Sequence, residues 1–161
     1  MKAKIFLSSR LQRLLADTIR ELAMQGRFYE EKEAMQHGST TIYRHSVHVA
    51  YVSLFLMEKW QFPMDEASLV KGALLHDYFL YDWHEKDGGH RLHGFRHPAF
   101  ALYNASKDFS LNRKEKNIIA RHMFPLTVLP PRCLEAWIVC FVDKYCAFSE
   151  TMGDGRIQWE R

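Results

Sequence analysis

Apolar residues recur at helical spacing along nearly the whole chain, and no run of residues shows the convincing alternation expected of a strand. In the first segment, residues 9–24, the apolar positions fall on one face: Leu11, Leu14, Leu15, Ile19, Leu22 and Ala23. Gly26 interrupts this segment, and a short second element follows over residues 28–36. The pattern predicts an amphipathic N-terminal helix whose apolar face packs on the rest of the protein.

Capping residues and prolines divide the remaining chain into further helices. Ser39 or Thr40, Asp65 and Asn112 are N-cap candidates, and Pro98 suits the first turn of its helix. The expected helices cover residues 40–60, 66–77, 98–107, 112–124 and 130–150. The pattern therefore predicts an all-α fold, a single helical bundle of about six or seven helices.

The same pattern suggests how the chain is organised. We expect residues 39–150 to form the bundle, residues 1–38 a helical extension packed on it, and residues 151–161 a C-terminal tail. Residues 78–96 are aromatic and polar and contain Gly88-Gly89, which predicts a long loop. Because long loops without secondary structure are usually functional or disordered, this loop is a candidate binding segment.

Composition narrows the classes of protein to consider. A chain of 161 residues with 47% hydrophobic and 25% charged residues is ordinary for a soluble globular domain. The net charge of +3 is too weak to indicate nucleic acid, and no stretch approaches the roughly 20 apolar residues of a membrane span. Cys133, Cys140 and Cys146 are an odd number without a CxxC motif, so we expect no disulfide framework and a cytoplasmic location.

The chain contains nine histidines, an unusually high number, and one of them belongs to a conspicuous pair. The motif Leu74-Leu75-His76-Asp77 is an apolar helix end that stops on two adjacent polar residues. Such a pair can cap the helix or hold a divalent metal. The negative end of the helix dipole favours a cation at this position.

Asp143 is a stronger candidate for a metal ligand, because it lies in the middle of a predicted helix. Its neighbours on the helix face are all apolar: Val139, Cys140, Cys146 and Ala147. A carboxylate on such a face costs several kcal/mol unless it is paired or coordinates a cation. The alternatives to a metal ligand are a buried ion pair and a helix cap.

Three further histidines occupy suitable places. His45 lies beside the core-facing stripe of its helix, His97 precedes Pro98 at a helix start, and His122 follows Ile118-Ile119. Each alone can be an ordinary core or loop histidine. Together with the residues above they give four histidines and two aspartates, which suit Zn, Fe, Mn or Co and can hold two metals bridged by a carboxylate.

The order of these residues resembles the HD superfamily of metal-dependent phosphohydrolases over about residues 40–150. The matching elements are His45, Ala73-Leu74-Leu75-His76-Asp77 and Val142-Asp143-Lys144. Two more, Arg96-His97-Pro98 and Ile118-Ile119-Ala120-Arg121-His122, resemble the extra ligands of the binuclear branch. That branch includes HD-GYP phosphodiesterases and HD-type bacterial diadenosine tetraphosphate hydrolases. In this chain Leu80 replaces a lysine that helps many members handle phosphate. The absence of a GYP sequence argues against cyclic-di-GMP hydrolysis.

The resemblance implies an HD domain that binds one or two divalent ions, Fe, Mn, Zn, Co or Ni, with Mg as an alternative. The implied metal ligands are His45, His76, Asp77, His97, His122 and Asp143. His45, His76, Asp77 and Asp143 would form one site. His97 and His122 would complete a second site, with Asp77 as the bridge. Of the residues proposed for catalysis, Asp77 is the bridge, His48 would donate a proton or contact substrate, and Lys144 would contact phosphate or be a solvated lysine.

The implied activity is hydrolysis of a phosphate ester or anhydride of a nucleotide by a metal-activated water. We therefore expect a small-molecule phosphate substrate and neither membrane nor nucleic acid as a partner; a homodimer is left open. In the 78–96 loop, Tyr78, Tyr81 and Trp83 can stack on a base or pack beneath the loop. The alternatives are an HD-type di-iron oxygenase, which the same ligands support, and a metal-binding HD module without turnover.

Overall fold

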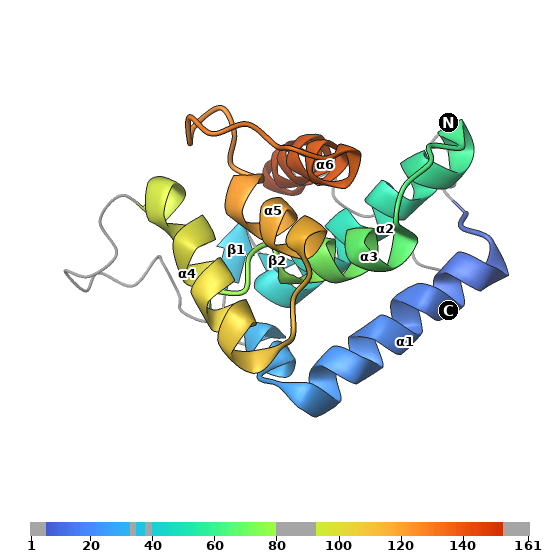
Figure 1. The fold of residues 1–161 in the computed structure, drawn as a ribbon, viewed down its shortest axis with the longest axis horizontal. Helices are drawn as coiled ribbons and strands as arrows, with labels where there is room; N and C mark the ends of the chain where they lie inside the picture. The colour runs from blue at the N-terminus through green and yellow to red at the C-terminus, as the bar shows by residue number, and fades with distance from the viewer. Residues whose placement is uncertain (1–5, 33–34, 38–39, 80–92, 153–161) are drawn as a thin grey trace.

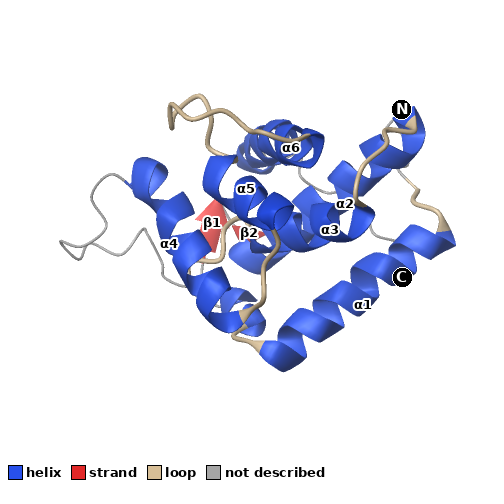
Figure 2. Ribbon diagram, in the orientation of Figure 1, coloured by secondary structure: helices blue, strands red, loops and turns tan. Residues whose placement is uncertain are grey.

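The computed structural model describes residues 6–32, 35–37, 40–79 and 93–152. Six α-helices dominate this part of the chain, which confirms the all-α prediction (Figures 1 and 2). They are α1 (Ser9–Gln25), α2 (Ile42–Trp60), α3 (Glu66–Leu75), α4 (His93–Asp108), α5 (Arg113–Arg121) and α6 (Leu134–Thr151). A 3-10 helix, η1 (Phe28–Lys32), and a short antiparallel pair, β1 (Met35–His37) with β2 (Thr40–Thr41), lie between α1 and α2.

Helix α3 lies at the centre of the fold, in contact with α1, α2, α5 and α6. Seven of its ten residues are buried, which explains why its sequence is apolar on every side rather than amphipathic. Gly72 lets α5 approach closely, because a Cβ at this position would lie 3.0 Å from Cβ of Ile118. The missing side chain therefore sets the distance between α3 and α5.

The N-termini of α3 and α5 are joined by a polar network. The side chain of Asp65 caps α3 by accepting from the backbone N–H of Ser68, and that of Asn112 caps α5 in a capping box with Glu115. Asn112 Nδ2 also donates to Ser68 Oγ at 2.8 Å. Since the two helices are pinned at their beginnings and packed along their lengths, their C-terminal ends hold a fixed separation.

Helix α1 packs against α2 and α3 through a stripe of buried leucines, Leu11, Leu15 and Leu22. The side chains of Arg10 and Glu66 form a two-fold hydrogen-bonded ion pair, with N···O distances of 2.5 and 2.8 Å. The N-terminal helix therefore lies where the pattern placed it, while the division of the chain at residue 38 stays a prediction. Figure 1 shows α1 and α6 on opposite sides of the α2–α3 pair.

Several helix boundaries differ from the predicted ones. Helix α4 begins at His93, so Pro98 lies within it rather than in its first turn; being near the start, this proline removes only one helical hydrogen bond. Helix α5 ends at Arg121 rather than near residue 124. Helix α6 begins at Leu134, after N-cap Cys133 rather than at Pro130. The strand pair was not predicted, because two or three residues cannot show a period.

None of the described helices has both the length and the apolar character needed to cross a membrane.

The close approach at Gly72 gives a stability prediction. Gly72→Ala should lower the free energy of unfolding by about 1–3 kcal/mol, because the new methyl group overlaps Ile118 on a rigid helix. Thermal unfolding followed by circular dichroism measures the effect. Ile118→Val removes the atom nearest to the new methyl, so the double variant should lose less than the sum of the two single variants. Additive losses would contradict the contact.

Candidate metal centre

The pair His76 and Asp77 lies where α3 ends. His76 is the C-cap residue, and its Nδ1 donates to the carbonyl of Ala73 at 2.7 Å. This hydrogen bond fixes the tautomer of the neutral ring, so that Nε2 carries the lone pair. Both side chains are buried. Asn104 of α4 donates to the carbonyls of Tyr78 and Phe79, which holds the backbone that follows.

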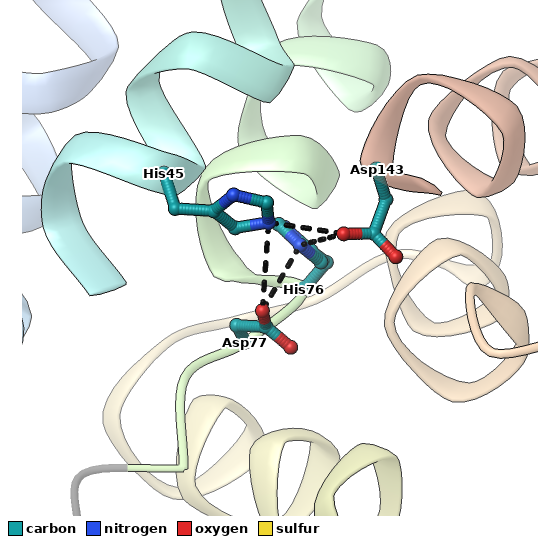
Figure 3. Close-up of side chains that lie close together, drawn as sticks. All are labelled: His45, His76, Asp77 and Asp143. Atoms are coloured by element: carbon teal, nitrogen blue, oxygen red, sulfur yellow. Dashed lines mark hydrogen bonds and ion pairs between the residues drawn. The ribbon is translucent and has the colours of Figure 1, made fainter. Parts of the chain in front are cut away.

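Helices α2 and α6 bring two further ligands to this point (Figure 3). His45 Nε2 lies 3.0 Å from Asp143 Oδ1 and 3.8 Å from Asp77 Oδ2. His76 Nε2 lies 3.3 Å from Asp77 Oδ2 and 3.5 Å from Asp143 Oδ1. Four buried side chains from α2, α6 and the C-terminal end of α3 thus direct their ligand atoms toward a common point.

A second group forms on the other side of the Asp77 carboxylate. His97 Nε2 lies 3.2 Å and His122 Nε2 3.3 Å from Asp77 Oδ1, the oxygen not directed at the first group. The two Nε2 atoms are 2.8 Å apart. The structure therefore brings all six predicted ligands together in two groups that share Asp77.

Helices α3 and α5 present their histidines in the same way. His122 is the C-cap of α5, and its Nδ1 donates to the carbonyl of Ile119 at 2.8 Å, three residues back, as His76 does to Ala73. In both helices the lone pair of Nε2 therefore points beyond the helix end. The partial negative charge of a helix C-terminus favours a cation at this position.

The donor set fits divalent metal ions. Ligand atoms about 2.1 Å from one ion lie about 3.0–3.4 Å apart in octahedral or tetrahedral geometry, close to most of the separations in both groups. His76 Nε2 is buried and has no hydrogen-bond partner among the described residues. A buried polar atom without a partner costs free energy in the protein alone, and a metal ion would supply the missing contact.

The charges within the first group support the same conclusion. Burial alone would lower the pKa of His45, but hydrogen bonds to Asp143 and Glu150 outweigh it and raise that pKa to about 9. Burial would likewise raise the pKa of Asp143, yet its histidine partners hold that pKa well below the usual range. Carboxylates therefore stay ionised here and attract positive charge, either protons on the imidazoles or a metal ion that displaces them.

Glu150 is a functional residue that sequence reasoning missed. Its Oε2 lies 2.9 Å from His45 Nδ1 and its Oε1 lies 3.0 Å from His48 Nδ1. It thus holds the ring of a candidate metal ligand, as carboxylates commonly do beside metal-binding histidines. The available signal was its spacing: Glu150 follows Asp143 by seven residues, two turns of α6, and so lies on the same face.

The two other residues proposed for catalysis have defined surroundings. His48 is buried beside the first group through its contact with Glu150. Lys144 Nζ donates to the carbonyls of His122 at 2.8 Å and Cys140 at 3.1 Å, so its ammonium group supports the end of α5. The proposed contacts of these side chains with substrate stay predictions.

The residues expected to select substrate are only partly described. Tyr78 is fully buried and donates through its hydroxyl to Asp108 at 2.8 Å, so it is a packing residue rather than a stacking platform for a base. Tyr81 and Trp83 lie outside the described residues. Residues 93–96, which we expected in the loop, belong to α4.

The raised pKa of His45 predicts how metal-free protein responds to pH. A histidine whose pKa rises from 6.5 to about 9 on folding stabilises the protein fully below pH 6.5, and this contribution is lost as pH rises through 9. With chelator present, the free energy of unfolding should fall between pH 6.5 and 9 by on the order of 2–3 kcal/mol. Denaturant titrations at several pH values measure it.

Glu150→Gln is the matched control, because it removes one of the two carboxylates that raise the pKa of His45. The variant should show a smaller loss over the same pH range. An equal loss in the two proteins would contradict the assigned cause.

Comparison with known proteins adds an independent finding to this geometry. The family model described as HD domain matches residues 42–147, well over half of the chain. Comparisons with curated proteins and with solved structures gave no match. The matched residues contain five helices and all six candidate ligands, in the order of the sequence. The chain therefore belongs to the HD domain family, a superfamily of metal-dependent hydrolases.

Proposed function

We propose that the protein is a metal-dependent phosphohydrolase acting on a phosphate ester or anhydride of a nucleotide. The observation that carries the proposal is the buried Asp77 carboxylate, whose two oxygens face two different histidine groups. A carboxylate placed between two ligand groups is suited to bridge a pair of metal ions, the arrangement that many phosphate-cleaving enzymes use.

The geometry supports an assignment of ligands to each proposed ion. His45, His76, Asp143 and Asp77 Oδ2 would hold one ion, and His97, His122 and Asp77 Oδ1 the other. Bound divalent ions lower the pKa of water and neutralise phosphate oxygens, which is the chemistry that phosphoryl hydrolysis needs. The helices keep the six side chains buried, and hydrogen bonds at Nδ1 fix the tautomers of His45, His76 and His122, so that little reorganisation is needed when ions bind.

Glu150 and His48 form a candidate path for the proton that the leaving group needs. Because His48 Nδ1 donates to Glu150 Oε1, proton exchange with a substrate would take place at His48 Nε2. Glu150 stays ionised: burial would raise its pKa, but hydrogen bonds from His45 and His48 outweigh burial and lower it to about 2. The ionised carboxylate accepts from His48 Nδ1 and thereby fixes the orientation of the ring whose Nε2 would exchange the proton.

The proposed substrate is a small nucleotide. Small nucleotides are favoured because the net charge of +3 is too low for a nucleic-acid surface. Lys144 directly follows Asp143, a proposed ligand of the first group, but its ammonium is engaged with backbone carbonyls. Its contribution to phosphate binding would therefore require those hydrogen bonds to break.

Metal content tests the assignment of ligands. Wild-type protein loaded with Mn, Fe or Co should bind two ions per chain, and His122→Ala should bind one, because that change affects only the second group. Asp77→Asn should lose binding to both groups. Elemental analysis after dialysis measures the ratio, and an unchanged ratio in Asp77→Asn would contradict the shared carboxylate.

A phosphatase screen tests the activity itself. Wild-type protein with Mn, Fe, Co, Ni or Mg would be assayed against mononucleotides, dinucleoside polyphosphates and cyclic dinucleotides, and at least one class should be cleaved. Asp77→Asn should reduce the rate by at least about 1,000-fold, since both ions depend on it.

Asp17→Asn is the matched control for the screen, because Asp17 lies exposed on α1 and should leave the rate unchanged. Metal-loaded protein that cleaves none of these substrates would contradict the proposed activity. Oxygen consumption by an iron-loaded sample would then favour the oxygenase.

A further inference from the structure

Helix α6 carries a second apolar stripe on the side opposite its core-facing residues. Six apolar residues follow one another at alternating intervals of four and three residues: Leu134, Ile138, Phe141, Tyr145, Phe148 and Met152. Ile138 is partly buried against the core, and the other five are exposed. Phe141, Tyr145, Phe148 and Met152 are 59–68% exposed, and Leu134 is 51% exposed. An average interval of 3.5 residues is the spacing by which one helix presents a continuous seam to another.

The charged residues of α6, a helix described from end to end, all make contacts within the same molecule. Glu135 accepts from Lys114 at 2.7 Å, and the ammonium of Lys144 donates to His122 and Cys140 carbonyls. Asp143 and Glu150 face His45. An outer helix face normally carries charged or polar residues, so this helix has the composition of one that is buried on all sides.

An aromatic series continues the stripe beyond the helix. Trp137 stacks on Phe141 at a centroid distance of 5.7 Å, and Phe124 packs against Trp137 at 5.5 Å. In the segment that follows Phe124, Val128 and Leu129 are also exposed. The stripe is thus part of a wider apolar surface on the side of the molecule where α6 lies, at the edge of the fold in Figure 1.

The area of the stripe can be set against the requirement of a stable interface. Large side chains present about 150–250 Å² each, so the five exposed members leave roughly 500–600 Å² uncovered per molecule. That value matches the largest apolar patches of ordinary monomers, which are themselves often functional. Two such faces packed together would bury about 1,000 Å² or more, which reaches the lower limit of area for a biological interface.

We infer that the α6 stripe is the interface for a second copy of this chain, giving a two-fold dimer. A two-fold interface brings one patch against the same patch, and a seam of aromatic residues without an unpaired charge is complementary to itself. The inference does not depend on the proposed activity. It links the interface to the metal centre, because Asp143 and Glu150 lie on the opposite face of the same helix.

Sedimentation velocity and light scattering over micromolar to near-millimolar concentrations test the inference on the full chain. Wild-type protein should have twice the mass of one chain and dissociate on dilution. Phe148→Glu should raise the dissociation constant at least about 30-fold, because it places two carboxylates within the apolar seam. Tyr145→Glu should have the same effect at the middle of the stripe.

Tyr103→Glu is the matched control, since Tyr103 is 68% exposed on α4, away from the stripe. It should leave the dissociation constant unchanged. Circular dichroism and metal content should be as in wild type for every variant, which shows that loss of the dimer is not loss of folding. A wild-type protein that is monomeric at all concentrations would overturn the inference, as would a dimer that Phe148→Glu leaves intact.

Discussion

The fold depends on the burial of one carboxylate. Asp77 is almost completely buried, and its two oxygens lie within 3.8 Å of four histidines from four different helices or helix ends. An ionised carboxylate removed from water is costly unless positive charge compensates it. The surrounding histidines supply that charge either as protonated rings or through a shared metal ion. Helices α2, α3, α4 and α5 are therefore positioned so that each brings one histidine to this carboxylate.

The residues that join α3 to α5 are different from the residues that could bind metal. At one end of α3 and α5, neutral and charged polar groups cap the helices and join them, and Gly72 allows the close contact between them. At the other end, the same helices finish on histidines whose lone pairs face inward. The polar caps thus lie about one helix length from the ligands, and the Gly72–Ile118 contact about one turn from them. A cluster of ligands without its ion would by itself reduce stability.

Much of the candidate metal centre could be predicted from the sequence. Asp143 was identifiable because a charged residue stood among apolar helical neighbours, and His76 and Asp77 because they ended an apolar helix. Glu150 was not, since a glutamate near a helix end is usually solvated, and its inward direction depends on how α6 packs on α2. Tyr78 shows a choice that the sequence left open, between stacking on a base and packing beneath the loop. An aromatic residue beside a polar loop looks accessible, but its hydroxyl finds Asp108 only in three dimensions.

The ammonium of Lys144 has a consequence for the relative strength of the two ligand groups. It lies at the end of α5, hydrogen-bonded to the carbonyl of His122, and there it offsets the negative potential that the helix end would offer a cation. The first group has Asp143, its share of Asp77 and Glu150 beside His45, whereas the second has only its share of Asp77. The two groups should therefore load in sequence rather than together, the first tightly and the second weakly. Such a hierarchy would make the active form of the protein sensitive to the concentration of free metal around it.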